Sequence, residues 1–238
     1  MKINLLAFGA HPDDVELSCS GTLYQHKQMG YTTGVIDLTE GELGTRGNAK
    51  TRQKEATLAK DIMQLDIREN LGLRDGFFEI SEEALMKVIV AIRRYRPDII
   101  LCNAYNDRHP DHSRGGDLIQ RASFLSGLIK IETFDEEIQQ EPWRPKVLYR
   151  YVQDNYIIPD LVVDITSCYA VHREAILAYR SQFYNESSME PHTPISTKEF
   201  MAYNEARCRE YGRQIGVTFA EGFSKCRYLG VKDLFHLL

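Results

Sequence analysis

The amino-acid sequence predicts an α/β fold: a Rossmann-like, doubly wound and mostly parallel sheet with helices on both faces, in a single domain over residues 1–238. Three observations predict it. Short apolar runs alternate along the chain with longer amphipathic ones, which is the pattern of successive right-handed βαβ units. The first run, residues 3–10, is apolar without alternation, as expected for a strand that helices cover on both faces. A length of 238 residues suits one large domain better than two small ones.

Five segments are expected to be strands and six to be helices. The expected strands are residues 3–10, 34–39, 98–103, 147–152 and 161–165. The expected helices are residues 15–29, 49–65, 82–95, 113–126, 169–183 and 197–212.

The helix expected over residues 82–95 has the most regular pattern. Its apolar residues recur at the spacing of three and four that places them on one buried helix face. They are Leu85, Val88, Ile89 and Ile92. Ser81 is a typical helix start, and Pro97 limits the other end because the residue before a proline avoids helical geometry.

Composition excludes several classes of protein. The chain has 34 acidic and 29 basic side chains, a formal net charge of −5, and 43% hydrophobic residues. This apolar content excludes intrinsic disorder, and the acid excess argues against nucleic-acid binding, which needs a basic face. Because no uncharged apolar run approaches the roughly 18–20 residues of a membrane span, no membrane partner is expected.

The cysteines indicate a cytoplasmic location. There are five, they are widely spaced, and none forms a CxxC pair, which fits reduced thiols better than disulfides. Residues 1–10 superficially resemble a short signal peptide, but charged residues follow at once, and a first buried strand explains this segment better.

The tripeptide His-Pro-Asp occurs twice. One copy, His11-Pro12-Asp13, follows the first expected strand, and the other, His109-Pro110-Asp111, follows the strand expected at 98–103. Ligands of such sheets bind beyond the carboxyl ends of the strands, so both copies lie where a ligand site is expected. One copy alone would be a weak signal, whereas two in this context are a strong one.

These residue types suit a divalent metal with one open coordination position. Catalytic zinc takes three ligands from histidine and carboxylate side chains and leaves the fourth position to water. His11 and Asp14 are three residues apart, as are His109 and His112. If His11, Asp14 and His112 hold the metal, Asp13 and His109 remain to move protons during amide hydrolysis.

The HPDD turn at residues 11–14, the HPDH turn at 109–112 and the segment Gly21-Thr22-Leu23 resemble the LmbE/PIG-L-type zinc-dependent N-acetylglucosaminyl deacetylases. Residues 39–47, with Thr51-Arg52 and Glu55-Ala56, are similar to the bacillithiol-pathway members, which remove acetate from N-acetylglucosaminyl malate. The resemblance therefore implies a cytoplasmic metal-dependent hydrolase of bacillithiol biosynthesis.

The same resemblance implies a role for each residue of the two turns. His11, Asp14 and His112 would bind Zn²⁺, although such nitrogen and oxygen ligands also suit other divalent metals. Asp13 would be the general base. His109 would be the cationic group that stabilises the oxyanion or protonates the amine, and Asp111 would orient His109.

Arginines near the two turns are candidates for binding the substrate. A malate-bearing sugar carries two carboxylates, which arginine recognises by paired hydrogen bonds. Arg46, Arg52 and Arg108 are the nearest basic residues, with Arg52 and Arg108 preferred. The glycines of residues 41–47 would let that loop bend over a small-molecule ligand.

Each of these residues also has a structural interpretation. The histidines could be partly buried and capped by aspartates; Asp13, Asp14 and Asp111 could be helix N-caps; and the arginines could be surface charges.

Three other functions are alternatives to this interpretation. A nucleotide-dependent oxidoreductase would need Gly-x-Gly-x-x-Gly after the first strand, where this chain has Gly9-Ala-His-Pro-Asp-Asp. A non-catalytic, metal-held sugar-binding module and a deacetylase of another N-acetylated sugar remain alternatives. A homo-oligomer also remains open.

Overall fold

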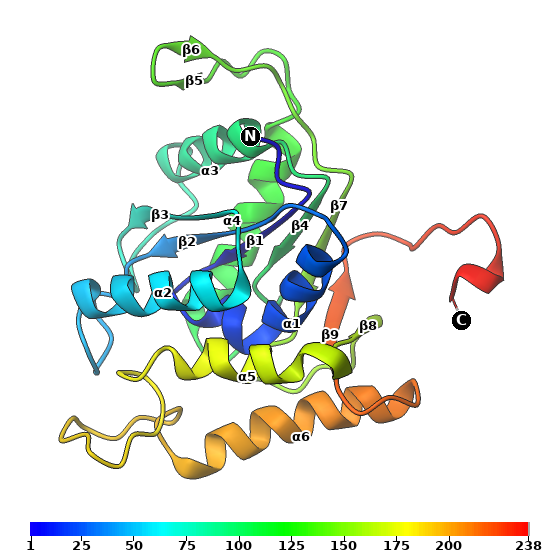
Figure 1. Ribbon diagram of the computed structural model, residues 1–238. Coiled ribbons are helices and arrows are strands. Elements are labelled where there is room, and N and C mark those ends of the chain that lie inside the picture. The colour runs from blue at the N-terminus through cyan, green and yellow to red at the C-terminus, as the bar shows by residue number, and fades with distance from the viewer. Residues whose placement is uncertain (238) are drawn as a thin grey trace.

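A seven-stranded sheet forms the centre of the molecule in the computed structural model, which describes residues 1–237 (Figure 1). The strand order is β3-β2-β1-β4-β7-β9-β8. All neighbours from β3 to β7 pair in parallel, and β9 alone runs against its neighbours β7 and β8. The predicted mostly parallel, doubly wound α/β fold is confirmed.

The strands of this sheet are β1 (Leu5–Gly9), β2 (Thr33–Thr39), β3 (Ile67–Leu73), β4 (Ile99–Cys102), β7 (Val147–Tyr151), β8 (Leu161–Asp164) and β9 (Ala220–Lys225). A separate hairpin joins β5 (Phe134–Asp135) to β6 (Ile138–Gln139). The α-helices are α1 (Asp14–Gln28), α2 (Ala49–Met63), α3 (Glu82–Tyr95), α4 (Pro110–Leu125), α5 (Tyr169–Leu177) and α6 (Lys198–Gln214). Two short 3₁₀ helices, η1 (Thr166–Cys168) and η2 (Leu234–Leu237), complete the structure.

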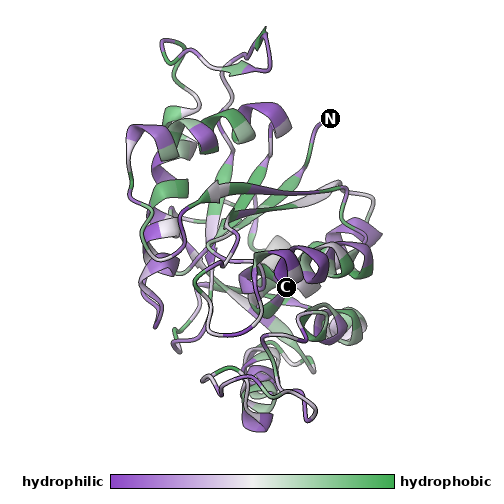
Figure 2. Ribbon diagram, turned by 90° about the vertical axis from the view of Figure 1, so that its left-hand side faces the viewer, coloured by the Kyte–Doolittle hydropathy of each residue, from purple (hydrophilic) through white to green (hydrophobic). Residues whose placement is uncertain are grey.

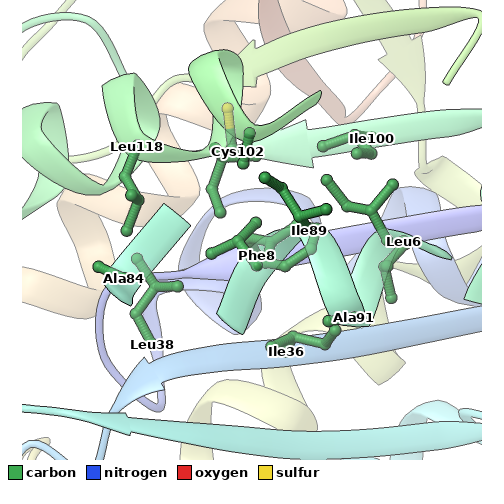
Figure 3. Close-up of a cluster of buried hydrophobic side chains, with 14 of the residues drawn as sticks. Leu6, Phe8, Ile36, Leu38, Ala84, Ile89, Ala91, Ile100, Cys102 and Leu118 are labelled. Atoms are coloured by element: carbon green, nitrogen blue, oxygen red, sulfur yellow. The ribbon is translucent and has the colours of Figure 1, made fainter. Parts of the chain in front are cut away.

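Two hydrophobic layers enclose the sheet because side chains of successive strand residues point to opposite faces. On one face, Leu6 and Phe8 of β1 pack with residues of α3 and α4, among them Ile89 and Leu118 (Figure 3). On the other face, Leu5 and Ala7 pack with residues of α1, α2 and α5. Figure 2 shows hydrophobic colouring along the central strands and hydrophilic colouring on much of the surrounding helices.

Strands β3 and β9 were not predicted. The sequence of β3, Ile-Arg-Glu-Asn-Leu-Gly-Leu, is mostly polar and partly exposed, since it forms one edge of the sheet. That of β9 contains Gly222 and three polar residues. Neither segment has the short apolar run on which the prediction of strands relied.

The helix bounds agree closely with expectation at α2, α3 and α6, and differ at two places. α4 begins at Pro110 rather than residue 113, because the His109 ring caps it and proline is favoured in the first turn. α5 ends at Leu177 rather than residue 183. Among the described residues, no helix has both the length and the apolar character that a membrane crossing requires.

Candidate metal centre and active site

The two His-Pro-Asp turns meet at the carboxyl ends of neighbouring strands. β1 and β4 pair in parallel, so the turns that follow them lie side by side. The ring centroids of His11 and His109 are 4.6 Å apart, those of His109 and His112 are 5.2 Å apart, and those of His11 and His112 are 5.5 Å apart. The structure therefore gathers three imidazoles from residues almost a hundred positions apart.

Asp14 lies between two of these imidazoles. Its Oδ2 is 3.7 Å from Nδ1 of His11, and its Oδ1 is 3.1 Å from Nε2 of His112. The amide of Asn103, just after β4, donates to Oδ2 of Asp14 at 2.9 Å and fixes the carboxylate. Asn103 also accepts from the backbone of Ala10 at 3.0 Å, which ties the first turn to the end of β4.

Each of the two histidines has a further carboxylate at its other nitrogen. Nε2 of His11 is 3.0 Å from Asp75 and 3.5 Å from Asp111, and Nδ1 of His112 contacts Asp107. Histidines that bind a metal through one nitrogen usually donate from the other to a carboxylate, which fixes the ring and its tautomer.

The electrostatics of the centre favour positive charge. Burial alone would lower the pKa of His11, but hydrogen bonds with Asp111, Asp14 and Asp75 raise it well above its usual value. Burial is likewise outweighed at His112, where Asp14 and Asp107 raise the pKa to about 9. A cluster in which carboxylates outnumber cationic groups is the environment that a divalent cation requires.

Two sets of three side chains in the described part of the chain bring possible ligand atoms within 4.8 Å of one another. They are His11, His109 and His112, and His11, Asp75 and Asp111. In the second set, both carboxylates already accept hydrogen bonds, Asp75 from the Leu43 amide at 2.9 Å and Asp111 from the Gly76 amide at 2.7 Å. The predicted set of His11, Asp14 and His112 is neither of these: it shares two histidines with the first set and has Asp14 in place of His109.

His109 differs from the other two histidines. Its Nδ1 accepts from the backbone amide of Asp111 at 3.2 Å, so the proton of the neutral ring is on Nε2. Burial and the nearby charges of His11 and His112 lower the pKa of His109. A neutral ring with its proton on Nε2 is a hydrogen-bond donor, not a metal ligand. The expected cationic character of His109 therefore has no support in this geometry.

Asp111 is placed differently from the sequence-based expectation. Its carboxylate is directed to His11 and also accepts from Arg114 at 2.8 Å. Only its backbone amide contacts His109. The orientation of His109 thus comes from the helix N-terminus of α4, and the Asp111 side chain supports His11.

Asp13 adopts a rare backbone conformation, with φ of +121°. A residue other than glycine is strained in this region, and such strain is typical of functional sites. Asp13 is the N-cap residue of α1, yet its side chain makes no capping hydrogen bond. Instead, its carboxylate is 3.0 Å from the guanidinium of Arg52. The N-cap interpretation of Asp13 therefore does not explain its conformation.

The pKa of Asp13 is raised to about 7. Burial is the largest cause, Arg52 opposes it, and the negative charge of Asp14 adds to it. A cation held beside Asp14 would lower this value, since positive charge favours the carboxylate.

A cavity of about 690 Å³ opens onto this centre. Asp13, Asp14 and the three histidines line it, and so do several residues of α6. Arg52 and Arg108 also line it, while Arg46 is buried elsewhere and donates to the backbone of Ser181 and the side chain of Ser188. Of the three arginines predicted to bind substrate, the structure brings two to the cavity.

Asp75 was missed by the sequence analysis. It lies two residues after the end of β3, at the same edge of the sheet as the two His-Pro-Asp turns. Because β3 was not recognised as a strand, nothing indicated that Asp75 lies beyond the carboxyl end of one. Recognising β3 would have placed Asp75 among the candidates.

Comparisons with known proteins find similar proteins over most of the chain and a family match over its first half. Residues 6–123 match the PIG-L family, described as GlcNAc-PI de-N-acetylase. The diacetylchitobiose deacetylase of Thermococcus kodakarensis is 25% identical over 228 residues, which cover 92% of this chain and 81% of that protein.

Solved structures are similar to this chain over most of its length as well. The conserved protein TT1542 from Thermus thermophilus is 36% identical, with a TM-score of 0.84 and coverage of 97% of this chain and 98% of that one. The N,N'-diacetylchitobiose deacetylase from Pyrococcus horikoshii, solved with an inhibitor, is 25% identical, with a TM-score of 0.79 and coverage of 92% and 82%.

Proposed function

This chain belongs to the PIG-L family of de-N-acetylases, and from that premise we propose that it is a metal-dependent hydrolase which removes the acetyl group from an N-acetylglucosaminyl substrate. The observation that carries the proposal is the position of Asp14 between His11 and His112, each of which has a second carboxylate at its other nitrogen. This arrangement supports His11, Asp14 and His112 as the ligands of Zn²⁺ or another divalent metal. When bound, the metal would supply Lewis-acid polarisation and lower the pKa of water.

Asp13 is the proposed general base. It lies beside the ligand Asp14, lines the cavity, and is not used as a helix cap. Its carboxylate takes a proton from the attacking water as the water oxygen bonds to the acetyl carbon. Arg52 contacts both Asp13 and the carbonyl of Pro12, so its first proposed role is to hold the base. Arg52 also lines the cavity, and the predicted contact with substrate is its second proposed role.

His109 is the proposed hydrogen-bond donor to the developing oxyanion. As a neutral ring it donates from Nε2, which does not require a positive charge. When the carbon–nitrogen bond breaks, the proton held by Asp13 passes to the leaving amine, and acetate and the free amino sugar are the products. Asp111 supports His11 and the first turn of α4 during these steps.

The proposed substrate is N-acetylglucosaminyl malate, as the similarity of residues 39–56 to bacillithiol-pathway members implies. Arg108, which lines the cavity and pairs with Asp154 at its edge, is the candidate to bind one malate carboxylate. Arg46 is the weakest of the three arginine candidates, since its guanidinium is used by residues 181–191.

Acetate release tests the proposal. Metal-loaded protein would be incubated with N-acetylglucosaminyl malate and with N-acetylglucosamine, and chelator-treated protein would be the control. We expect acetate from the loaded protein alone, and faster from the malate-bearing sugar. Binding of both sugars without any acetate would favour the sugar-binding module instead, and equal rates on both would contradict the malate specificity.

A further inference from the structure

α6, which lies on the outer side of α5 in Figure 1, forms one side of the cavity. Aromatic side chains line this side, from Phe200 and Tyr203 of α6 and from Tyr156 of the loop between β7 and β8. Asn204, Arg207 and Glu210 of α6 add polar and charged groups. The way in which the Arg207 guanidinium is held there requires an explanation.

A break in α1 explains how Arg207 is held. The backbone of Cys19 is not helical, with φ of −151° and ψ of 17°. The amide of Gly21 donates at 2.9 Å to the carboxylate of Glu221 instead of to the carbonyl of Leu17, four residues earlier. The freed carbonyl of Leu17 accepts from Arg207 at 3.0 Å and from Asn204 at 3.0 Å. The guanidinium of Arg207 is therefore fixed through one nitrogen to a helix that begins at Asp14.

Arg207 differs from the other two arginines that line the cavity. Arg52 pairs with Asp13, and Arg108 pairs with Asp154. Among residues 1–237, no carboxylate lies within ion-pair distance of Arg207. Glu210, one turn further along α6, is engaged by Arg213 at 2.8 Å. Arg207 thus faces the cavity with an uncompensated positive charge.

Ser18 provides a second, independent observation. It follows Leu17 directly, lines the same cavity, and is only 3% exposed. Its hydroxyl oxygen has no hydrogen-bond partner in the described part of the chain. Since buried hydroxyls are nearly always hydrogen-bonded, the Ser18 hydroxyl at this cavity wall is free to bond a ligand atom.

We propose that Arg207 and Ser18 form a subsite that binds a carboxylate of the substrate's aglycone. This inference rests on the proposed function. It concerns the group that the sugar of the proposed substrate carries, and not the reaction. A guanidinium and a hydroxyl beside it match the two oxygens of a carboxylate. Arg108 at the cavity edge would take the other carboxylate of a dicarboxylic aglycone, and the aromatic residues would cover the carbon atoms between.

The test measures binding, so that it does not depend on turnover. Calorimetry would compare the deacetylated product, glucosaminyl malate, with its dimethyl ester, which has the same shape and no carboxylate charge. Wild-type protein should bind the diacid more tightly than the diester. Arg207→Gln should weaken diacid binding by about tenfold to a hundredfold, the range for hydrogen bonds to charged groups, and leave diester binding unchanged. Ser18→Ala should weaken diacid binding by roughly three- to tenfold.

Arg209→Gln is the matched control, because Arg209 is on the same helix, pairs with Glu205 and lies outside the cavity lining. It should bind both compounds as the wild type does. Equal binding of diacid and diester by the wild type, or equal weakening of both by Arg207→Gln, overturns the subsite. Absence of acetate release, with diacid binding still dependent on Arg207, would instead contradict the proposed reaction and retain the subsite.

Discussion

The imidazole of His11 has a carboxylate beside each of its two nitrogens. Asp14 lies on the side of Nδ1, and Asp75 accepts at Nε2 from 3.0 Å away. The second oxygen of Asp75 accepts from the amide of Leu43. Asp75 is thereby held by the backbone of another loop, which makes it a rigid support for a ligand.

Replacing Asp75 tests this support. We expect Asp75→Asn to lower the affinity for Zn²⁺ by about tenfold to a hundredfold, because the amide leaves the tautomer and orientation of His11 less defined. Competition with a chromophoric chelator measures this affinity. Asp160→Asn removes a surface acid that pairs with Lys225, and serves as the control. Unchanged affinity in Asp75→Asn would show that Asp75 does not orient His11.

Asparagine has nearly the same size and shape as aspartate but cannot act as a base. The substitution Asp13→Asn therefore tests the chemistry of Asp13 separately from its packing. We expect Asp13→Asn to lower the rate of acetate release by about a hundredfold to ten-thousandfold, since the amide accepts no proton from water. Metal content, measured by elemental analysis, should stay at the wild-type value because Asp13 is not a proposed ligand. A variant that retains half of the wild-type rate would remove Asp13 from the mechanism.

At the scale of elements, the break in α1 is stabilised from β9, the strand next to the edge strand β8. The carboxylate of Glu221 on β9 accepts from the amides of Gly21 and Thr22, and so caps the second half of the helix. Buried His172 of α5 lies 3.0 Å from the same carboxylate. A Cβ atom at Gly21 would lie 2.9 Å from Ile165, so only glycine fits at this crossing. Three elements thus meet at one buried charge.

This buried pair predicts a dependence of stability on pH. Burial alone would lower the pKa of His172, but Cys208 and Glu221 raise it to about 10, against 6.5 for an unperturbed histidine. A raised pKa means that the folded state binds the proton more tightly, so the stabilisation is complete below pH 6.5 and is lost as the pH rises through about 10.

We therefore expect wild-type protein to exceed His172→Gln in free energy of unfolding by more at pH 6 than at pH 10. Urea denaturation at several pH values measures the difference. His26→Gln, which removes a partly buried histidine bonded to a backbone carbonyl, is the matched control. A difference between wild type and His172→Gln that stays constant with pH would contradict the ion pair.

Much of this architecture could be predicted from the sequence, because its determinants are local. The apolar spacing and caps of α3 predicted both of its ends, and the apolar run of β1 predicted a central strand. β3 and β9 could not be found in this way. Their strand conformation depends on pairing with neighbours that are distant in sequence, as with β3 and β2, and not on their own residues.

At the scale of the whole molecule, the candidate centre joins segments that are far apart in the sequence. His11 comes from the turn after β1, Asp75 from the loop after β3, and His112 from α4. The repeated tripeptide allowed two of these segments to be predicted. Asp75 and Arg207 were not predicted, because each acts through a three-dimensional neighbour, His11 and Leu17 respectively, that sequence spacing does not reveal.

Removing the metal should therefore affect the whole fold. A ligand that binds only the folded state stabilises it by about 4 kcal/mol when its free concentration is about 1,000 times the dissociation constant. We expect chelation to lower the thermal unfolding midpoint and abolish acetate release, and added Zn²⁺ to restore both. Scanning calorimetry measures the midpoint. His112→Ala, which lacks one proposed ligand, should show a much smaller response to added Zn²⁺, and a wild-type response in this variant would place the ion elsewhere.

The shared carboxylate of Asp75 has one more consequence. Its two oxygens connect His11 to Leu43, and Leu43 belongs to the glycine-containing loop that borders the cavity. Linkage is reciprocal. A ligand that orders this loop therefore also fixes the His11 imidazole, and a cation that binds the imidazole also orders the loop. Substrate arrival and cation retention would then reinforce each other, and an idle enzyme would release its ion more readily than a working one.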